Sequence, residues 1–380
     1  MNVLVSTPAV VERVGNQYYN NTMSTLIPRY KQLGENLICL NTIVLRKKST
    51  LKELDTNNVE FVSVDKVNSI RSLFITQKRN EEKVREAVRK ADICVAHFPS
   101  FVAEQVARCA KKYNKPCLSV VAGCAWDAHW NYGIKGKLIA PFRFYTTKRA
   151  IYRASHVIYV TQEFLQKRYP TKGKSIGCSD VSIVSERESI LLQRLKNIEQ
   201  HKTILKIATI AAVDIPYKGQ MYVIEALKLL KEKGILFEYH LVGGGDSSPL
   251  KSLVNKYLLQ DSVFFHGLMA HEQIPAFLDD IDIYIQPSRT EGLPRALVEA
   301  MSRGCLSLGT DVGGIPELLD KKYLFPKGDV KEIVRMLKHI TPEILEEQAA
   351  INLEKSELYD EIVLSEKRKK FFEEFLNDKL

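Results

Sequence analysis

The feature that most constrains this chain is the stretch from Ile281 to Glu317, IDIYIQPSRTEGLPRALVEAMSRGCLSLGTDVGGIPE. Its pattern predicts a strand, a turn, a helix, a second strand and then a Gly-rich turn. Two carboxylates, Glu291 and Glu299, lie eight residues apart across the junction of turn and helix. Pro294 is expected just inside the helix, where its missing N–H costs nothing. The free N–H groups of that first turn bind anions and carboxylates accept hydroxyls, so the stretch favours a phosphorylated sugar as ligand.

The spacing of the two carboxylates is not specific by itself, because the pairs Glu346/Glu354 and Glu366/Glu374 show it too. Those pairs lie in continuous helical patterns, with no preceding strand and no turn. The context of the first pair is what distinguishes it. The surrounding residues that define this context are Pro287, Ser288, Gly292, Leu293, Pro294, Ala300, Met301, Gly304, Asp311, Gly313, Gly314 and Glu317.

Taken together, these residues resemble the signature of the retaining glycosyltransferases of family 4. The resemblance implies the GT-B fold, an α/β architecture in which two Rossmann-like domains face each other across a cleft. A C-terminal helix then crosses back to the N-terminal domain. The resemblance also implies a nucleotide-diphosphate sugar as the donor substrate, with no cofactor and no metal ion.

Length and pattern agree with a two-domain chain, since 380 residues exceed what one compact core usually holds. Short β-rich runs alternate with helical patterns, which is typical of parallel α/β sheets. Strands are expected near 3–6, 37–44, 59–63, 93–96, 117–122 and 156–161, then near 204–210, 237–242, 263–266, 281–286, 305–309 and 323–325. The predicted division is an acceptor-binding domain (1–185), a polar connector (186–203), a nucleotide-sugar-binding domain (204–354) and a return helix (355–380).

Several classes of protein are disfavoured by composition. No apolar run approaches the roughly 18–20 residues of a membrane span. The first ten residues, MNVLVSTPAV, resemble a strand rather than a secretory signal. Seven cysteines, odd in number, scattered and without CxxC spacing, predict reduced buried thiols of a cytosolic protein rather than disulfides or a zinc site.

The positive charge of the chain is concentrated in residues 129–175. That segment holds ten Lys or Arg against one acid, Glu163, and so carries +9 of the formal net charge of +10. Large apolar side chains are interleaved with it: Trp130, Tyr132, Leu138, Ile139, Phe142, Phe144 and Tyr145. Three interpretations are weighed: docking on an anionic membrane leaflet, at about 1 kcal/mol per basic residue, a solvated basic face beside a phosphate-handling cleft, and nucleic-acid binding. No nucleic-acid-binding motif accompanies the charge, so a nucleic-acid partner is not expected.

Lys218 is the candidate for stabilising a leaving diphosphate, which needs positive charge. It follows the first strand of the second domain and precedes Gly219, and the resemblance places a diphosphate-binding lysine at this Lys-Gly pair. The family usually carries Gly-Arg six residues earlier, where this chain has Ala211-Ala212. Alanine cannot supply a guanidinium fork. Either Lys218 and the helix N-terminus suffice, or another basic residue substitutes, or catalysis is weak.

The two carboxylates have different expected roles, which the resemblance supplies. Glu291 corresponds to the catalytic residue that faces the donor sugar, and Glu299 to the residue that takes the ribose hydroxyls. The alternative for Glu299 is an acid favoured by the dipole of the helix N-terminus. Further donor-binding candidates in this region are Gly292, Leu293, Pro294 and Gly313.

Three further donor-binding candidates rest on shorter motifs. Gly243 and Gly244 follow a strand and resemble the family's Gly-rich turn, where glycine lets backbone approach a ligand; a plain tight turn is the alternative. His266 ends the next strand and resembles the family's base-binding position. Gly15 and Asn16 are expected in the loop after the first strand, where the family uses glycine amides near phosphate and acceptor.

Asp127 and His129 are the catalytic candidates of the first domain, in the turn after the strand near 117–122. Relatives of the resembled family often place a histidine or an acid there, and a histidine can relay a proton. A structural loop histidine is the alternative, and His97 at another strand end is a third candidate. Asp280 and Asp282 resemble a metal-binding DxD motif, but we reject this interpretation because Asp282 begins a buried strand.

The sequence therefore predicts a retaining, metal-independent glycosyltransferase that moves a sugar from a nucleotide-diphosphate donor to a glycan acceptor. The basic, aromatic segment favours a lipid-linked acceptor, a cytoplasmic enzyme peripheral at the inner membrane face, and a pathway that builds capsule or lipopolysaccharide. Two alternatives stay open: a catalytically degenerate GT-B partner of an active enzyme, and another GT-B enzyme such as a nucleotide-sugar epimerase. A sugar phosphorylase would usually be longer and carry a pyridoxal-binding lysine context, neither of which the chain shows.

Overall fold

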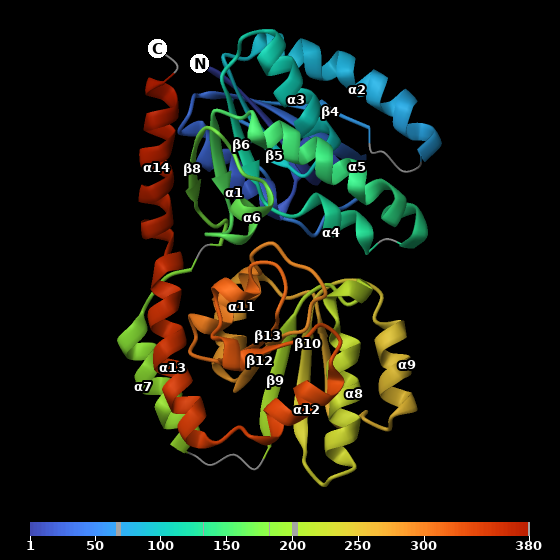
Figure 1. The fold of residues 1–380 in the computed structure, drawn as a ribbon, viewed down its shortest axis with the longest axis vertical. Coiled ribbons are helices and arrows are strands. Elements are labelled where there is room, and N and C mark those ends of the chain that lie inside the picture. The colour runs from blue at the N-terminus through green and yellow to red at the C-terminus, as the bar shows by residue number, and fades with distance from the viewer. Residues whose placement is uncertain (66–69, 132, 182, 200–203, 379–380) are drawn as a thin grey trace. The chain divides into compact units, whose positions relative to one another are not determined.

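The computed structural model describes residues 1–65, 70–131, 133–181, 183–199 and 204–378. The chain forms two compact α/β units, one made of Met1–Cys178 with Glu366–Leu380 and the other of Ser179–Ser365. Figure 1 shows a sheet flanked by helices in each unit. This confirms the predicted class of two parallel-sheet α/β domains. No helix within the described ranges is both long and apolar enough to span a bilayer.

The first unit is built on a sheet with the order β4-β3-β1-β5-β6-β7-β8, in which these neighbours pair in parallel. Strand β5 is buried at every residue, as expected for a parallel strand covered on both faces. The strands are β1 (Asn2–Val14), β2 (Gln17–Tyr19), β3 (Asn36–Leu45), β4 (Val59–Ser63), β5 (Ile93–Phe98), β6 (Cys117–Val121), β7 (His156–Tyr159) and β8 (Lys174–Gly177). The sequence predicts a loop at the position of β8. The strand was missed because it is short and polar, and its first residues are exposed at the edge of the sheet.

Helices of the first unit begin with local polar caps where the sequence offers them. The Asn20 side chain accepts a hydrogen bond from the Met23 amide, and Ser100 accepts one from Ala103. The helices are α1 (Asn21–Lys31), α2 (Ile70–Lys90), α3 (Phe101–Lys112), α4 (Ala125–Trp130), α5 (Gly133–Tyr152), α6 (Phe164–Arg168) and, from the far end of the chain, α14 (Glu361–Asn377).

Helix α14 returns to the first unit, as predicted. Phe371 and Phe375 are buried, with their ring centroids 5.7 and 5.2 Å from that of His156 on β7. Leu358 and Ile362, which the sequence assigns to the same apolar face, are instead 69% exposed. Leu358 lies in the short 3-10 turn Glu357–Tyr359 that separates α13 from α14. Ile362 lies on α14 nine residues before Phe371, which places it on the opposite side of that helix.

The second unit has the strand order β11-β10-β9-β12-β13-β14 and is parallel throughout. This is the doubly wound order of a Rossmann fold, whose connections change direction between β9 and β12. Ligands of such sheets bind beyond the carboxyl ends of the strands at that switch point. The strands are β9 (Leu205–Ile210), β10 (Phe237–Val242), β11 (Val263–Gly267), β12 (Ile283–Gln286), β13 (Leu306–Thr310) and β14 (Leu324–Phe325).

The connections of the second unit are helical. The helices are α7 (Arg187–Glu199), α8 (Gln220–Lys231), α9 (Ser248–Lys256), α10 (Ile274–Asp279), α11 (Arg295–Met301), α12 (Val330–Lys338) and α13 (Pro342–Ser356). Short 3-10 turns supplement them: η1 (Pro216–Lys218), η2 (His271–Gln273), η3 (Ile315–Glu317), η4 (Lys321–Tyr323) and η5 (Glu357–Tyr359). Helix α7 falls in the predicted connector, of which residues 200–203 lie outside the described part of the chain.

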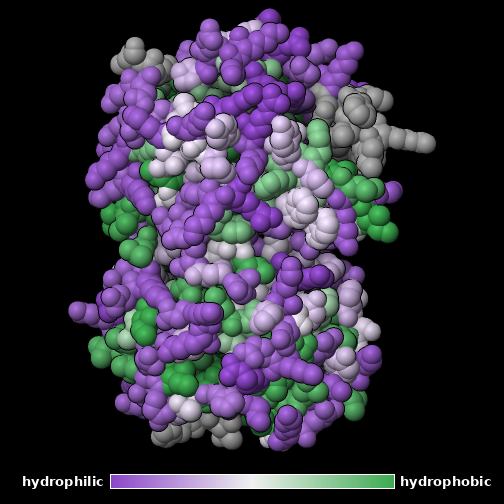
Figure 2. Space-filling view, viewed as in Figure 1, coloured by the Kyte–Doolittle hydropathy of each residue, from purple (hydrophilic) through white to green (hydrophobic). Residues whose placement is uncertain are grey.

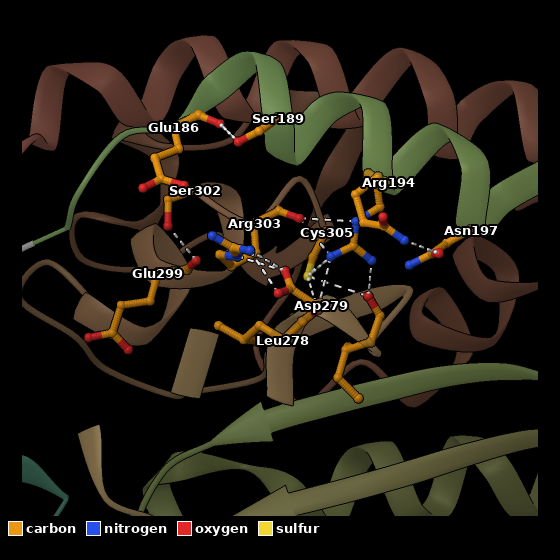
Figure 3. A network of polar contacts seen from close by, with 12 residues as sticks. Glu186, Ser189, Arg194, Asn197, Leu278, Asp279, Glu299, Ser302, Arg303 and Cys305 are labelled. Atoms are coloured by element: carbon orange, nitrogen blue, oxygen red, sulfur yellow. Dashed lines mark hydrogen bonds and ion pairs between the residues drawn. The ribbon is translucent and has the colours of Figure 1, made fainter. Parts of the chain in front are cut away.

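A buried arginine, Arg194, links α7 to the rest of the second unit. Its side chain is 4% exposed, and its guanidinium donates to the backbone oxygens of Leu278, Ile281 and Arg303. These carbonyls follow the last turns of α10 and α11, where the helix leaves oxygens without partners. Figure 3 shows the cluster, with Arg303 reaching across to Asp279 at 2.7 Å. One buried cation therefore fixes the C-terminal end of the helix that carries Glu299.

We expect Arg194→Met to lower the free energy of unfolding by about 3–5 kcal/mol, because several buried carbonyls lose a charged donor and each unsatisfied group costs about 1–3 kcal/mol. Urea titration followed by circular dichroism measures the change. The matched control is Arg187→Met on the same helix. Arg187 forms surface ion pairs with Glu354 and Glu357, so its loss should cost about 0–1 kcal/mol. Equal effects of the two variants would contradict this account of Arg194.

Candidate active site

One carboxylate oxygen collects three donors at the switch point of the second sheet. Glu291 Oε1 accepts hydrogen bonds from Lys218 Nζ at 2.7 Å, Ser288 Oγ at 2.6 Å and Gln286 Nε2 at 3.0 Å. Lys218 ends η1 in the loop after β9, and the other residues belong to β12 and the turn after it. Because β9 and β12 are adjacent, two site residues predicted from distant parts of the sequence form one ion pair. Both side chains are mostly buried, at 22% exposed for Lys218 and 11% for Glu291.

A buried polar chain behind Glu291 orients its donors. The Tyr284 hydroxyl donates to Gln286 Oε1 at 2.8 Å, and Gln286 Nε2 donates to both Ser288 Oγ and the carboxylate. Burial raises the pKa of Tyr284 well above its ordinary value, so the hydroxyl keeps its proton. Neither Tyr284 nor Gln286 is a candidate in the sequence analysis. The available signal was Gln286 itself, a polar residue that closes an otherwise apolar strand.

Two glycines let neighbouring loops approach the site. Gly219 has φ +78°, and a Cβ there would lie 2.0 Å from the carbonyl oxygen of Pro287. Gly313 has φ +61°, and its Cβ would lie 2.2 Å from the carbonyl oxygen of Glu291. Both positions need a residue without a side chain. The loops after β9, β12 and β13 are therefore in van der Waals contact at the carboxyl edge of the sheet.

The turn before α11 differs slightly from the prediction. Pro294 precedes the helix as its N-cap, with φ −74° and ψ 111°, and the helix begins at Arg295. The prediction that Pro294 stands inside the helix is therefore wrong by one residue, because its ψ is extended rather than helical. Leu293 and Pro294 are buried, and the oxygen of Gly292 accepts the Gly314 amide at 2.7 Å. The turn is thus anchored by two buried side chains and by a hydrogen bond to the loop after β13.

Glu299 lies on α11 with its side chain 16% exposed, 3.6 Å from Nε2 of His271. Hydrogen bonding to Glu299 raises the pKa of His271 above its ordinary value, against the opposing effect of burial. Figure 3 shows the Glu299 carboxylate directed away from the Arg194 cluster. His271 stands in η2, after β11. No spacing in the sequence connects it to Glu299, so this partner was not predicted.

The glycine run after β10 is required by the loop after β9. A Cβ at Gly243 would lie 2.0 Å from the oxygen of Ala211, and the Gly244 oxygen accepts the Val213 amide at 3.1 Å. The oxygen of Ala212 accepts a hydrogen bond from Gln220 at 3.0 Å. The close approach of the two loops accounts for Gly243, whereas a Cβ at Gly244 would lie 3.9 Å from Leu268 and would be accommodated. Whether Gly243 and Gly244 also contact a ligand stays a prediction.

His266 is exposed at the end of β11 and belongs to a small histidine cluster. Its Nε2 lies 3.0 Å from Nδ1 of His240, whose Nε2 is 3.3 Å from Glu238. Burial lowers the pKa of both histidines below the ordinary value. The pair is therefore neutral at pH 7, and the His240 ring is stacked between Phe264 and His266.

Gly15 and Asn16 occupy a position that the sequence analysis did not anticipate. Strand β1 continues to Val14 instead of ending near residue 6, and β2 turns back on it in antiparallel pairing. Gly15 and Asn16 form the hairpin turn, where both accept hydrogen bonds from Arg13, at 2.9 Å to Gly15 O and 3.4 Å to Asn16 Oδ1. The predicted loop directly after a short first strand is thus wrong. The alternating burial of residues 7–14 explains the extension, because β1 pairs with β3 along this stretch.

Asp127 and His129 lie on α4 in the first unit. Asp127 Oδ1 is 3.7 Å from the guanidinium of Arg168. His129 is half-buried, and burial, with a smaller contribution from the charge of Arg143, lowers its pKa. His129 is therefore a neutral imidazole at pH 7, the form that can accept a proton. The two residues come from the unit that does not contain the Lys218–Glu291 pair.

The remaining polar candidates have structural partners. His97 is 5% exposed, and its Nε2 lies 2.6 Å from the Tyr30 hydroxyl. At the amino end of β12, Asp282 accepts the backbone amide of Lys206, and Asp280 forms an ion pair with the side chain of the same lysine. These acids lie at the opposite end of the strand from Glu291, in agreement with our rejection of a DxD site.

The cysteines of the chain are reduced thiols. All seven cysteines are free thiols and six are buried, as predicted. Burial raises the pKa of Cys39 and Cys117 to about 12. Within the ranges the structure describes, no three His, Cys, Asp or Glu side chains gather as a metal site would require.

Comparison with known proteins gives a consistent result. The family model described as "Glycosyl transferases group 1" matches residues 193–351. Protein CapJ of Staphylococcus aureus is 31% identical over 343 residues, which cover 89% of this chain and 85% of that protein. The putative colanic acid biosynthesis glycosyltransferase WcaL of Escherichia coli K12 is 33% identical over 176 residues, 43% of each chain.

A solved structure extends the likeness to the whole fold. The crystal structure of Anabaena Alr3699/HepE in complex with UDP and glucose matches this chain with a TM-score of 0.68 and 16% identity, over 99% of each chain. At 16% identity the match supports the fold and nothing further. The parallel sheets of both units, together with such structural neighbours, confirm the predicted GT-B fold.

The contact between His271 and Glu299 predicts a displaced titration. Because the carboxylate favours the imidazolium, His271 should stay protonated to a pH above the ordinary histidine value of 6.5, and the attraction should be lost as pH rises through this higher pKa. NMR titration of the imidazole resonances measures it. Glu299→Gln should lower the pKa of His271 clearly, whereas Glu272→Gln, which removes a weaker neighbouring charge, should lower it less. The reverse order would contradict the geometry.

Proposed function

The chain belongs to the glycosyl transferases of group 1, and from this premise we propose that it moves a sugar from a nucleotide-diphosphate sugar to a hydroxyl of a glycan acceptor. We further propose that the reaction retains the anomeric configuration, needs no metal ion and serves the synthesis of a cell-surface polysaccharide. The name of WcaL, a putative colanic acid biosynthesis glycosyltransferase, supports the pathway. The UDP and glucose bound to HepE support the donor class.

The observation that carries the proposal is the Lys218–Glu291 pair at the switch point between β9 and β12. Breaking the bond between sugar and diphosphate leaves negative charge on the phosphate oxygens. A lysine held in place before the reaction stabilises that charge without reorganisation, and a partly buried site makes the attraction stronger than in water. Lys218 has this position, because Glu291 fixes its ammonium group.

Glu291 is suited to the sugar as well as to the lysine. Its Oε1 is occupied by three donors, whereas no described residue donates a hydrogen bond to Oε2. A carboxylate oxygen of this kind accepts sugar hydroxyls. On the proposed reaction, Glu291 holds the donor sugar, Glu299 takes the ribose hydroxyls, and the N–H groups at the start of α11 face the phosphates.

The proposed chemistry is the one that the resemblance to retaining glycosyltransferases implies. The anomeric carbon–oxygen bond to the diphosphate breaks, and the acceptor oxygen forms a new bond to the same face of the sugar. The leaving phosphate takes the hydroxyl proton. His129 and Asp127 of the other unit are both proposed to contact the acceptor hydroxyl. We propose a lipid-linked acceptor, used at the cytoplasmic face of the membrane.

A second candidate function is supported by the loop after β9. Ala212 stands where the resembled family carries an arginine; its backbone oxygen accepts a hydrogen bond from Gln220, and Gly243 lies close to the backbone of Ala211 and Ala212. A site with one cation fewer would bind the donor more weakly. A catalytically degenerate partner of an active transferase therefore stays open, as does a nucleotide-sugar epimerase that would use the same donor site.

Lys218→Ala is expected to slow release of nucleoside diphosphate from the donor by roughly 100- to 1,000-fold, the range typical of losing one preorganised donor to a developing anion. The variant should fold, because Glu291 keeps Ser288 and Gln286 as donors. Lys233→Ala, exposed just after α8, is the matched control and should leave turnover unchanged. NMR of the product should show the anomeric configuration of the donor, and EDTA should not inhibit. Inversion or inhibition would contradict those parts of the proposal.

Thermal-shift measurements with UDP, GDP, ADP and CMP separate the alternatives. A nucleotide at 100 times its dissociation constant should raise the free energy of unfolding by about 2.7 kcal/mol. A response to none of the four would count against the donor site itself. A response without turnover of any nucleotide sugar would favour the degenerate partner. Interconversion of the donor sugar without transfer would favour the epimerase.

A further inference from the structure

Helix α5 is packed with its apolar residues outward. Its buried face consists of Gly136, Ala140, Arg143, Thr147 and Ile151. Its outer face carries large apolar side chains, and their exposed fractions are high: Ile134 80%, Leu138 74%, Phe142 59%, Tyr145 62% and Tyr152 44%. A surface helix of a soluble domain normally shows the opposite arrangement. Figure 2 shows hydrophobic residues at the right-hand edge of the molecule, where Figure 1 places α4 and the start of α5.

The exposed residues form one stripe rather than a scatter. Ile134, Leu138 and Phe142 are four residues apart, and Tyr145 and Tyr152 continue the same line at helical spacing. Basic side chains border the stripe on both sides: Lys135 and Arg153 along one edge, Lys137 and Lys148 along the other. All four are exposed, exposed Arg149 interrupts the stripe between Tyr145 and Tyr152, and α5 contains no acidic residue. On α4, Trp130 is 40% exposed and lies under the ammonium group of Lys137. Tyr132 lies outside the described residues.

A buried ion pair holds the helix in this orientation. Arg143 is 1% exposed and donates to Glu104 of α3 at 2.7 Å. The hydroxyls of Thr146 and Thr147 donate to the other oxygen of the same carboxylate. The guanidinium also lies over the ring of Phe101, 3.6 Å from its centroid. Turning the apolar stripe inward would expose this network and leave Glu104 buried without its cation, so the outward stripe is fixed by the fold.

We propose that the outer face of α5 docks on a membrane leaflet that contains anionic phospholipid. The apolar stripe would lie at the level of the acyl chains, while the bordering lysines and arginines extend to the phosphates. Charge complementarity selects this occupant, since the exposed basic residues on and next to α5 are Lys135, Lys137, Lys148, Arg149 and Arg153, and α5 has no acidic residue. Aromatic side chains such as Trp130 and Tyr145 suit the boundary between lipid and water. The inference does not depend on the sugar chemistry of the other unit.

A nucleic acid would use this face poorly. Phosphate contacts need the basic residues, and bases can stack on aromatic rings such as Phe142. Ile134 and Leu138, however, are the two most exposed members of the stripe, and an aliphatic side chain gains little from a base or a phosphate. The observations therefore favour a bilayer over a polyanion.

Cosedimentation with vesicles tests the proposal on the full chain, without donor or acceptor. Equal parts of phosphatidylglycerol and phosphatidylcholine should bind the protein, and pure phosphatidylcholine should bind it far more weakly. The triple variant Ile134→Gln, Leu138→Gln, Phe142→Gln should weaken binding by about tenfold or more, because buried apolar area is lost. The matched control, Leu192→Gln, Leu358→Gln, Ile362→Gln, changes residues of similar exposure away from this face and should bind as wild type.

A second set of variants tests the charges. Lys135→Gln, Lys137→Gln, Lys148→Gln should weaken binding by about fivefold per residue at low salt, the equivalent of about 1 kcal/mol each. Lys196→Gln, Lys233→Gln, Lys331→Gln, exposed lysines of the second unit, should have little effect. Far-ultraviolet circular dichroism and donor hydrolysis, unchanged in all four variants, separate lost docking from unfolding or lost catalysis.

Three results would overturn the proposal. The first is no binding to the anionic vesicles. The second is equal binding to both vesicle types. The third is loss of binding in the lysine variant but not in the apolar variant, together with tight binding of single-stranded DNA by wild type; the face would then be a general polyanion surface.

Discussion

The candidate active site depends on a single carboxylate oxygen. Glu291 Oε1 joins a lysine from the loop after β9 to a serine and a glutamine from the neighbouring β12 segment. An anion that is 11% exposed is stable only because these donors replace the water it has lost. The same bonds place the Lys218 ammonium group at the edge of the sheet. One interaction thus settles both the position of the cation and the shape of the turn beneath it.

The glycines of the site follow from this constraint. Lys218 can reach Glu291 only if its loop passes close to Pro287, and Gly219 allows that contact. Gly313 does the same for the loop after β13, which touches the backbone of Glu291. A methyl group at either position would push a loop away and lengthen the central ion pair. The two glycines therefore help to keep Lys218 and Glu291 at the distance of an ion pair.

The sequence predicts the parts of this site that depend on local geometry. The loops at Gly219 and Gly313 are recognisable because their positive φ and close backbone contacts restrict which residues can occupy them. The partners of the charged groups are not recognisable in the same way. His271 reaches Glu299 only through the way η2 packs near α11, and no periodicity records that contact. Gln286 lies within the motif, yet its role depends on the Tyr284 hydroxyl behind it.

The features of the fold that the sequence predicts are those that depend on patterns of many residues. The strand positions and the parallel α/β class follow from buried runs that alternate with helices, and these are patterns of many residues. The burial of single residues within polar helices is harder to predict. Arg194 lies in a helix interpreted as a connector, and it is only 4% exposed. It is buried because it binds carbonyls at the ends of two other helices. Leu358 was misassigned because it lies in the turn before α14, and Ile362 because it lies on the opposite side of α14 from Phe371.

Helix α5 shows why hydropathy alone could not orient that segment. Phe142 and Arg143 are adjacent in sequence, and the pattern would bury the phenylalanine and expose the arginine. The structure does the reverse, because Glu104 on α3 needs a cation in the interior. Leaving five large apolar side chains in water forgoes about 1.5–3 kcal/mol for each one that could be fully buried. Apolar area that is not buried on folding remains available for association, and this is the physical basis of the proposed docking of α5 on an anionic bilayer.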